Sequence, residues 1–593
     1  MKKMQKMRKI IALCLTVVFM CASVAGFSGC GKKNADDKGA ILTIYLAGDP
    51  SNLNLDPGKM IYSSEEVKYL GLIFEGMMTM DENGKLQNGI CKSYTITDDD
   101  ANKIYKIDFN LKDTKWSDGI PVSADDFVYA WKRILDPAFA SPAASLLYDV
   151  KNARAVKNGD MTVDDLGAVA LDTTLLEVTF DHKIDYNKFL ENLASISLVP
   201  LRRDTVDPAP DDWAKKPLTL LTDGPFKVTQ MDYNKTTTLE RSTYYLLKKD
   251  ETNIFKYVKP YRIVLDFSRT LDQLTDAYTA NNGDIFYLGN VPMAKYANFS
   301  GKAVLKDMLS AYSYHFNTSN PLFSKAEVRK ALSIALDRNQ IASIVGLGVK
   351  PATGIVPTGV IDATATADFR EVGDKNGQLI NPAGDVAAAK SLLQTAGVTS
   401  GSFELKYKDN EVEKAVADYA ASVWQQLGFT VTETAMKGVQ YGDDINSANY
   451  DVIGYDDQAL GVDAFSVLAP FAKPFCGNVI SFQSEGTSTV LPYITGFQND
   501  SYDSMIEDIF STGTDNNTRT QKLHDAEKAL VDLAPIAPLY FNTNINITDK
   551  ISGLSYSKFG NAIFTKANLP NYQQYITTET AAAPAADAAS PTT

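Results

Sequence analysis

An alternating pattern of hydrophobic and polar residues at positions 105–112 predicts a strand with one buried face. The segment 116–121 that follows, WSDGIP, has the composition of a turn, because Gly tolerates positive φ and Pro fixes φ. The predicted strand therefore ends in a reversal of the chain. The apolar members of the alternation are Tyr105, Ile107, Phe109 and Leu111.

A helical period replaces the alternation after this turn. Ser123 is the expected N-cap, and Pro137 ends the helix. The apolar residues between them fall on one stripe, so this face should pack against the strand. The stripe consists of Phe127, Ala130, Trp131, Ile134 and Leu135.

The same two periods recur along the chain. They predict strands at 41–46 and 429–432, two short strands within 166–180, and helices at 65–78, 324–338 and 411–427. Ser324 and Glu327 stand in capping-box register, and Gly428 is placed to end the last of these helices. Helices that alternate with single strands indicate an α/β fold, and 593 residues exceed one hydrophobic core, so we expect two or three lobes.

The two ends of the chain differ from the rest. Residues 1–29 combine a basic head with an apolar run too short to span a bilayer, which is typical of an export signal. Cys30 directly follows and is the expected lipidation site, with residues 30–39 as a flexible tether. Residues 573–593 are rich in Ala, Pro and Thr, so we expect a disordered tail.

Charge and reactive residues narrow the function. Removal of residues 1–29 takes away five bases and no acid, which leaves 53 bases against 72 acids, a net charge of −19. Such a surface repels nucleic acid. The chain has three scattered histidines and no HExxH, P-loop, GxGxxG or GxSxG motif, so we expect no enzyme, no metal and no cofactor; a secreted hydrolase is the weaker alternative. Cys91 and Cys476 are expected as buried thiols, with a bridge as the alternative.

Several motifs together resemble one family. They are WSDG-x-P and ADDF-x-Y-x-W-x-R-x-L-D-P in 116–137, FEGM at 74–77, DGPF at 223–226 and VRKALSIALDR at 328–338. They resemble the extracellular solute-binding proteins, family 5, that feed oligopeptide and dipeptide ABC transporters. The resemblance implies a type II periplasmic-binding-protein-like α/β fold: lobe I (40–85, 200–310 and 540–572), an extra subdomain inserted in it (86–199), and lobe II (311–539). A two-crossing hinge would join the lobes, with 311–318 and 539–543 as the strands by which the chain crosses and returns. The segment 385–393 also resembles a helix of the family.

The resemblance also implies where ligand would bind. Residues 450–468 resemble the family segment whose strand end pairs with an extended peptide and whose carboxylate meets the ligand amine; the loop after the first strand lines the groove. Asp463 is the first choice for that carboxylate, because its spacing to Phe465 and Leu468 matches best, and Asp456 and Asp457 are the alternatives. The implied ligand-binding set is Gly454, Tyr455, Asp456, Asp457 and Asp463, with Gly48, Asp49 and Ser51 at the groove rim.

A monomeric, lipid-anchored receptor for extracellular oligopeptides is therefore the expected function. The resemblance implies ABC permease and ATPase subunits as partners, membrane attachment through Cys30, and a position outside the cytoplasmic membrane, in a Gram-positive-type envelope or a Gram-negative periplasm. A nickel chelate, haem, a sugar or a signalling peptide remain alternative ligands for the same fold.

Overall fold

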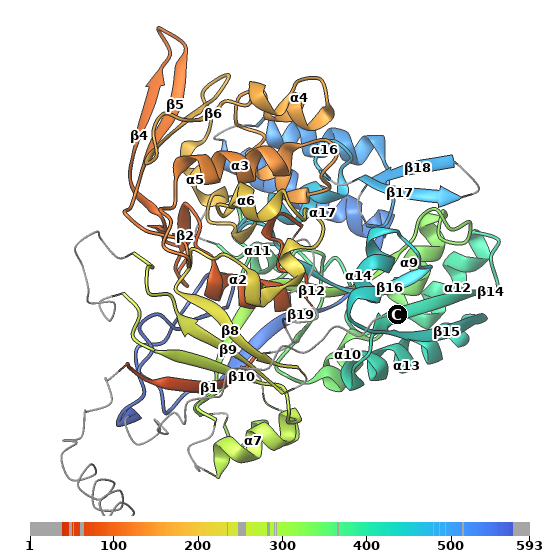
Figure 1. The fold of residues 1–593 in the computed structure, drawn as a ribbon. Helices are drawn as coiled ribbons and strands as arrows, with labels where there is room; N and C mark the ends of the chain where they lie inside the picture. The colour runs from red at the N-terminus through yellow and green to blue at the C-terminus, as the bar shows by residue number, and fades with distance from the viewer. Residues whose placement is uncertain are drawn as a thin grey trace, which may run out of the picture.

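The structure is a computed structural model of the chain (Figure 1). It describes residues 38–46, 50, 53–59, 64–233, 235–246, 257–280, 285–289, 291, 293–299, 301–363, 367–477, 479–484, 487–492, 494–512 and 515–572. The expected leader 1–29, Cys30, the rim residues Gly48, Asp49 and Ser51, and the tail 573–593 lie outside these ranges.

One lobe is built on a five-stranded mixed sheet in the order β11-β1-β10-β9-β8. β1 lies parallel to β10 and β11, and the other neighbours are antiparallel. The predicted first strand is confirmed, and its Leu42 and Ile44 are fully buried. The elements are β1 (Ile41–Tyr45), β8 (Phe226–Asp232), β9 (Thr236–Arg241), β10 (Arg262–Asp266), β11 (Tyr287–Leu288), α2 (Ser64–Ile73), α7 (Leu271–Thr279) and α8 (Met293–Tyr296).

A four-stranded antiparallel sheet, in the order β4-β5-β7-β6, forms a second unit, whose β4–β5 hairpin projects at the top of Figure 1. The predicted strand, turn and helix are confirmed. Gly119 has φ +92°, the Ser123 amide donates to Asp126 Oδ2 at 2.9 Å, and the whole predicted stripe of α3 is buried. The elements are β4 (Cys91–Asp99), β5 (Ile104–Leu111), β6 (Ala168–Ala170), β7 (Leu175–Thr179), α3 (Ala124–Leu135), α4 (Ala153–Asn158), α5 (Tyr186–Asn192) and α6 (Arg203–Val206), beside the hairpin β2 (Met78–Met80) and β3 (Leu86–Asn88).

The other lobe has a six-stranded sheet in the order β13-β19-β12-β16-β14-β15. Its central strands β12 and β19 pair antiparallel, and just beyond β19 Ile547 pairs with Leu288 of β11, which links this sheet to the first lobe. The strands are β12 (Val304–Phe316), β13 (Lys350–Pro351), β14 (Gly401–Lys408), β15 (Phe429–Met436), β16 (Val452–Gln458) and β19 (Ile536–Asn546).

Nine α-helices accompany this sheet in the described part of the chain. Two short hairpins, in addition to β2–β3, complete the fold. The helices are α9 (Ala326–Ile334), α10 (Arg338–Val345), α11 (Phe369–Lys375), α12 (Val386–Thr395), α13 (Glu411–Gln425), α14 (Gly438–Asn446), α15 (Phe465–Leu468), α16 (Asp500–Phe510) and α17 (Asn516–Leu533). The remaining hairpins pair β17 (Val479–Ser484) with β18 (Thr487–Pro492), and β20 (Ser555–Tyr556) with β21 (Ala562–Ile563).

Two helix predictions are wrong in detail. The helix expected at 65–78 ends at Ile73, because the chain turns into β2 within a few residues. The helix expected at 324–338 is two helices, α9 and α10, and Ser324 is not its N-cap: Lys325 holds that position, and the Ser324 hydroxyl donates to the Pro321 carbonyl at 2.8 Å.

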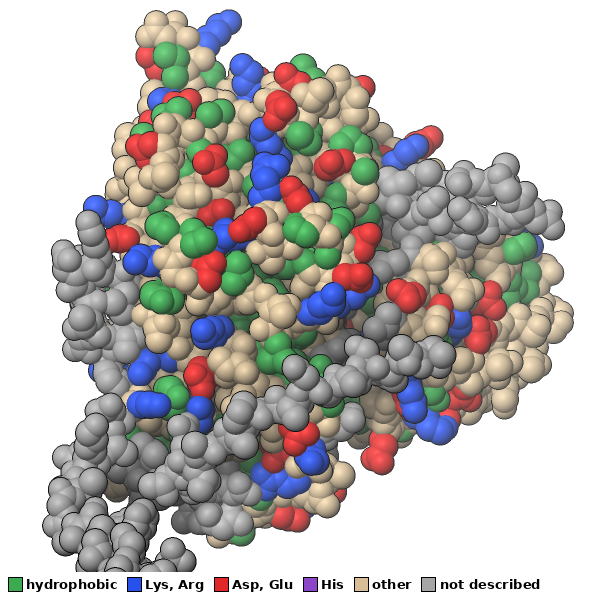
Figure 2. All heavy atoms as spheres, in the orientation of Figure 1, with side chains coloured by type: hydrophobic (Ala, Val, Ile, Leu, Met, Phe, Trp, Pro, Cys, Tyr) green, Lys and Arg blue, Asp and Glu red, His purple; other side chains and the backbone are tan. Residues whose placement is uncertain are grey.

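Cys91 and Cys476 are buried free thiols, so the bridge between them offered as an alternative does not form. Burial raises the pKa of the Cys91 thiol to about 11, which keeps it protonated and unreactive at neutral pH. Among the described residues, no helix has both the length and the apolar character needed to cross a membrane. On the face shown in Figure 2, acidic and basic side chains are interspersed.

Candidate functional site

The candidate site is the edge of β16 beyond the end of its pairing with β14. This strand pairs with β12 from Val452 to Gln458, but β14 on its other side pairs only with Val452 and Ile453. Residues 454–458 therefore continue the ladder with β12 beyond the end of the pairing with β14. Helix α2 of the first lobe lies against β16, so this edge faces the boundary between the lobes.

Gly454 and Tyr455 shape this edge. A Cβ atom on Gly454 would lie 2.0 Å from the Tyr312 hydroxyl, so no larger residue fits there without movement. The Gly454 carbonyl accepts a hydrogen bond from the Tyr441 hydroxyl at 2.6 Å. The Tyr455 ring is fully buried, with its centroid 5.0 Å from that of His315. These two residues fix the strand rather than present side-chain chemistry.

Asp456 lies on the face of the sheet that carries Tyr312, and it accepts a hydrogen bond from Asn542 Nδ2 of β19 at 2.8 Å. The buried Glu413 carboxylate is nearby and accepts from the Tyr312 hydroxyl at 2.9 Å. Burial raises the pKa of Glu413 to about 7; Lys408 opposes this rise, and the charge of Asp456 adds to it. Asp456 thus belongs to a polar cluster on one face of the central strands β12 and β19.

Asp457 points to the opposite face, because side chains alternate along a strand. Its Oδ2 lies 2.9 Å from His315 Nε2, and its side chain is 15% exposed. Asp457 and its neighbour Gln458 line a cavity of about 20 Å³, room for about one water molecule. The other lining residues are Pro142, Ile355, Pro357, Ala459, Leu460, Ser466, Val467, Pro470, Phe471 and Ile536.

Asp463 has different surroundings. Its carboxylate contacts Lys188 Nζ of α5 at 2.5 Å and Arg519 Nη2 of α17 at 3.2 Å, and it accepts from the Ser466 amide at 3.2 Å. Burial alone would raise the pKa of Asp463, but the two cations outweigh burial and hold it below its usual value. The charge of Asp463 is therefore balanced by side chains of the chain itself. Its expected role at the ligand amine stays a prediction, in which a ligand would compete with Lys188 and Arg519.

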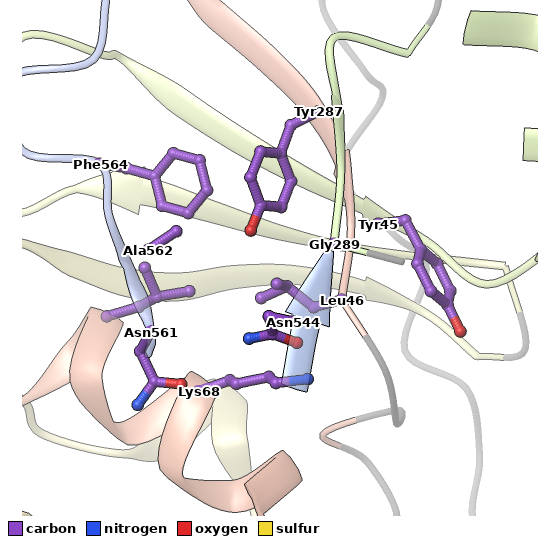
Figure 3. Close-up of a pocket in the computed structure, with 10 residues that line it drawn as sticks. Tyr45, Leu46, Lys68, Tyr287, Gly289, Asn544, Asn561, Ala562 and Phe564 are labelled. Carbon is purple, nitrogen blue, oxygen red and sulfur yellow. The ribbon is translucent and has the colours of Figure 1, made fainter. Parts of the chain in front are cut away.

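A second small cavity lies where β1 ends (Figure 3). The Tyr287 hydroxyl points into it and donates to Asn546 of β19. Asn544 of the same strand is 4% exposed, and in the described residues its Oδ1 accepts no hydrogen bond. At about 10 Å³ this cavity holds at most a water molecule. Its lining residues are Tyr45, Leu46, Lys68, Leu72, Tyr287, Gly289, Asn544, Asn561, Ala562 and Phe564.

Sequence reasoning missed four residues of this region: Lys188, His315, Gln458 and Arg519. His315 left a signal, since it is a polar residue inside the apolar run 311–316 of a buried strand. Lys188 and Arg519 gave no such signal, because Lys and Arg are common on the solvent-facing sides of helices. Within the described ranges, no cluster of three or more His, Cys, Asp or Glu is placed to hold a metal ion.

Comparison with known proteins gives consistent results. Residues 85–478, more than half of the chain, match the bacterial extracellular solute-binding proteins, family 5 Middle. The chain is 28% identical over 515 residues to the periplasmic murein peptide-binding protein MppA of Escherichia coli (strain K12), which covers 85% of this chain and 88% of that protein. It is 29% identical over 509 residues to the probable deoxycholate-binding periplasmic protein YgiS of the same organism, covering 84% and 87%.

Two solved structures of MppA differ in how well they match. The structure of the Escherichia coli murein tripeptide binding protein matches with a TM-score of 0.71 at 25% identity, over 90% of this chain and 98% of that one. The unliganded open form matches with a TM-score of only 0.51 at 26% identity, over 90% and 97%. Because the coverage is nearly equal, the lobes of this chain are arranged differently from those of the open form.

These matches establish the fold as a two-lobe, type II periplasmic-binding fold of the α/β class. Members of the matched family are binding proteins rather than enzymes. The family is also the one that the sequence motifs resemble. The chain therefore belongs to the bacterial extracellular solute-binding proteins of family 5.

Proposed function

We propose that this protein is the lipid-anchored substrate-binding component of an ABC importer, which captures extracellular oligopeptides between its lobes and delivers them to the permease. The observation that carries the proposal is the edge of β16 at residues 454–458, which lies beyond the end of its pairing with β14 and faces the other lobe. Cys30 would hold the protein at the membrane through its lipid.

A peptide suits such an edge because it can add a strand to the sheet. Main-chain hydrogen bonds then supply affinity for any sequence, and pockets along the strand read alternate side chains. A ligand closes the lobes only through contacts that it makes better in the closed state. Contacts to β16 and to the first lobe at once meet this condition.

The relatives support a peptide ligand and also supply the main alternative. MppA is named for binding a murein peptide, whereas YgiS is named as a probable deoxycholate-binding protein, at nearly the same identity. A bile-acid-like ligand has no row of amides to pair with a strand edge. The backbone of the ligand is therefore the feature to test.

The test uses N-methylated peptides, which lose one amide donor at a chosen residue and keep the side chain. We first identify a bound peptide by native mass spectrometry of the mature protein purified from its source. Isothermal titration calorimetry should then show at least a tenfold loss of affinity, about 1.4 kcal/mol, for methylation at residues whose amides face β16. Methylation at the intervening residues, whose amides point away, is the matched control.

Equal losses at every position would rule out pairing with the edge of β16. Binding of deoxycholate with no detectable binding of any peptide would show that the ligand class is wrong. Intact peptide recovered after long incubation with the protein would separate capture from hydrolysis.

A further inference from the structure

We propose that the outer edge of β4 binds a second copy of this chain, with the two β4 strands paired antiparallel about a two-fold axis at Thr95. The four-stranded sheet of one copy then continues into that of the other. This inference is independent of the ligand, and it departs from the monomer that is expected from the sequence.

β4 is a long edge strand with little protection. It stands first in the order β4-β5-β7-β6, and among the described strands it pairs with β5 alone. It has nine residues, whereas β6 at the other edge has three. Short length, proline or charge usually protects an edge, because its unpaired amides and carbonyls can pair with another chain. The central residues 93–97 of β4, SYTIT, contain neither proline nor charge.

Two apolar rows run across this sheet and end at β4 without being covered. Each row has one residue on β7, one on β5 and one on β4, directly opposite one another. The members on β7 and β5 are fully buried, whereas Tyr94 and Ile96 on β4 are 37% and 38% exposed. A further strand beside β4 would cover both of these side chains. The rows are Leu176–Phe109–Tyr94 and Val178–Ile107–Ile96.

A second β4 strand supplies a match for this edge. With the axis at Thr95, Tyr94 lies opposite Ile96 of the second copy, so each apolar row continues into a row of the other sheet. At the ends of the paired segment Lys92 falls opposite Asp98, and the two-fold axis makes this contact twice. The strand is therefore complementary to itself in both hydrophobicity and charge.

Neighbouring positions of the axis fit less well. Directly opposed side chains share a face of the sheet, so a two-fold axis normal to the sheet must pass through a residue. An axis at Tyr94 would set Ile96 against Lys92, and an axis at Ile96 would set Tyr94 against Asp98. Asp98 contacts Lys183 Nζ of its own chain at 2.6 Å, but its side chain is 29% exposed, so a second cation can reach it.

The contact is small. Asn88 Nδ2 donates to the Lys92 carbonyl at 3.2 Å, so main-chain pairing would start at Ser93 and, by symmetry, end at Thr97. The β4–β5 hairpin projects from the molecule, so two hairpins can lie side by side (Figure 1). We therefore expect a reversible dimer whose population rises with protein concentration.

Cysteine cross-linking tests the axis, because only the residue on the axis lies opposite itself. Thr95→Cys in the full mature protein, under mild oxidation, should give at least about fivefold more disulfide-linked dimer than either of two controls. Thr97→Cys lies two residues along the same face of β4, and Val169→Cys lies on the edge strand β6, where Val169 is 49% exposed. Wild type oxidised in the same way gives the background from the native cysteines.

Sedimentation velocity tests the ion pairs. Lys92→Glu alone sets Glu against Asp98, and Asp98→Lys alone sets Lys against Lys92, so each variant should dimerise at least about fivefold more weakly than wild type. An equal mixture of the two variants should recover the dimer, because each contact then joins a base to an acid. Both residues are exposed, so urea unfolding should show little change in stability.

A wild type that stays monomeric at every concentration, with no cross-link for Thr95→Cys, would overturn the proposal. Equal cross-linking of all three cysteine variants would indicate random collision instead. A mixture that associates as weakly as its components would exclude this register, and a mass above that of a dimer would exclude a closed two-fold contact.

Discussion

Asp457 and Asp463, which lie close together in the sequence, carry the same side chain in opposite surroundings. Asp457 lies near the end of β16, partly exposed, beside a histidine and a small cavity. Asp463 is buried and contacts two cations that arrive from α5 and α17. The difference teaches that helices distant in sequence decide the role of an acid near the end of a strand. Where they supply cations, as at Asp463, the acid forms structural ion pairs; where they do not, it stays a candidate ligand contact.

Glu413 provides a third case that sharpens this comparison. It is as buried as Asp463, but its hydrogen-bond donors include the neutral Tyr312 hydroxyl and the Lys408 amide. Burial raises its pKa to about 7, whereas the pKa of Asp463 is lowered. Cations in direct contact, rather than depth, thus decide whether a buried acid in this lobe stays ionised.

The largest expected effect comes from Asp463→Asn. This change leaves Lys188 and Arg519 in a buried site without their carboxylate, and removing one member of a buried pair typically costs about 3–5 kcal/mol. Urea unfolding at pH 7 measures the loss. Because the folded pKa of Asp463 lies below its ordinary 3.8, this stabilisation is present above that pH and is lost as pH falls through the folded value.

Asp525→Asn is the matched control, since Asp525 is exposed on the same helix as Arg519 and should change stability by less than about 0.5 kcal/mol. Unchanged stability of Asp463→Asn together with lost peptide affinity would return Asp463 to the ligand site and reverse the comparison.

The next effect is a pH dependence at Glu413. Its folded pKa is raised from 4.5 to about 7, so the folded state holds this proton more tightly than the unfolded state. Its contribution to stability is full below pH 4.5 and declines as pH rises to about 7, by on the order of 3 kcal/mol. Glu413→Gln should flatten the profile of unfolding free energy over this range. A variant profile parallel to that of the wild type would contradict the assignment.

Much of the fold follows from local patterns. The alternation at 105–111 and the stripe of α3 needed only residue type and spacing, and both were right. Predictions at helix ends were weaker, because they depend on what packs next. Ser324 has the right spacing for a capping box, yet its hydroxyl turns back to the Pro321 carbonyl and the helix starts after Lys325.

The candidate site was only partly predictable. The segment 450–468 was found by its motif, but the pairing of β16 with β12 and, at Val452 and Ile453 only, with β14 is a long-range property. Of the two ion partners of Asp463, Lys188 lies 275 residues before it and Arg519 lies 56 residues after it. No pattern within a short stretch of sequence therefore connects them. Such contacts can be recognised only once the positions of three different elements in space are known.

The smallest expected effect comes from a more exposed ion pair at the same contact between the α3–α5 unit and the other lobe. Comparison with Asp463 tests how burial changes the stability that an ion pair contributes. Arg154 of α4 pairs with Glu507 of α16, and their side chains are 34% and 35% exposed. Glu507→Gln removes the charge but keeps the Arg154 guanidinium, whose carbon lies 5.0 Å from the Phe475 ring centroid. Because solvent screens such a pair, we expect a loss below about 1 kcal/mol in urea unfolding. A loss equal to that of Asp463→Asn would mean that location at this contact, and not burial of the carboxylate, determines how much an ion pair contributes to stability.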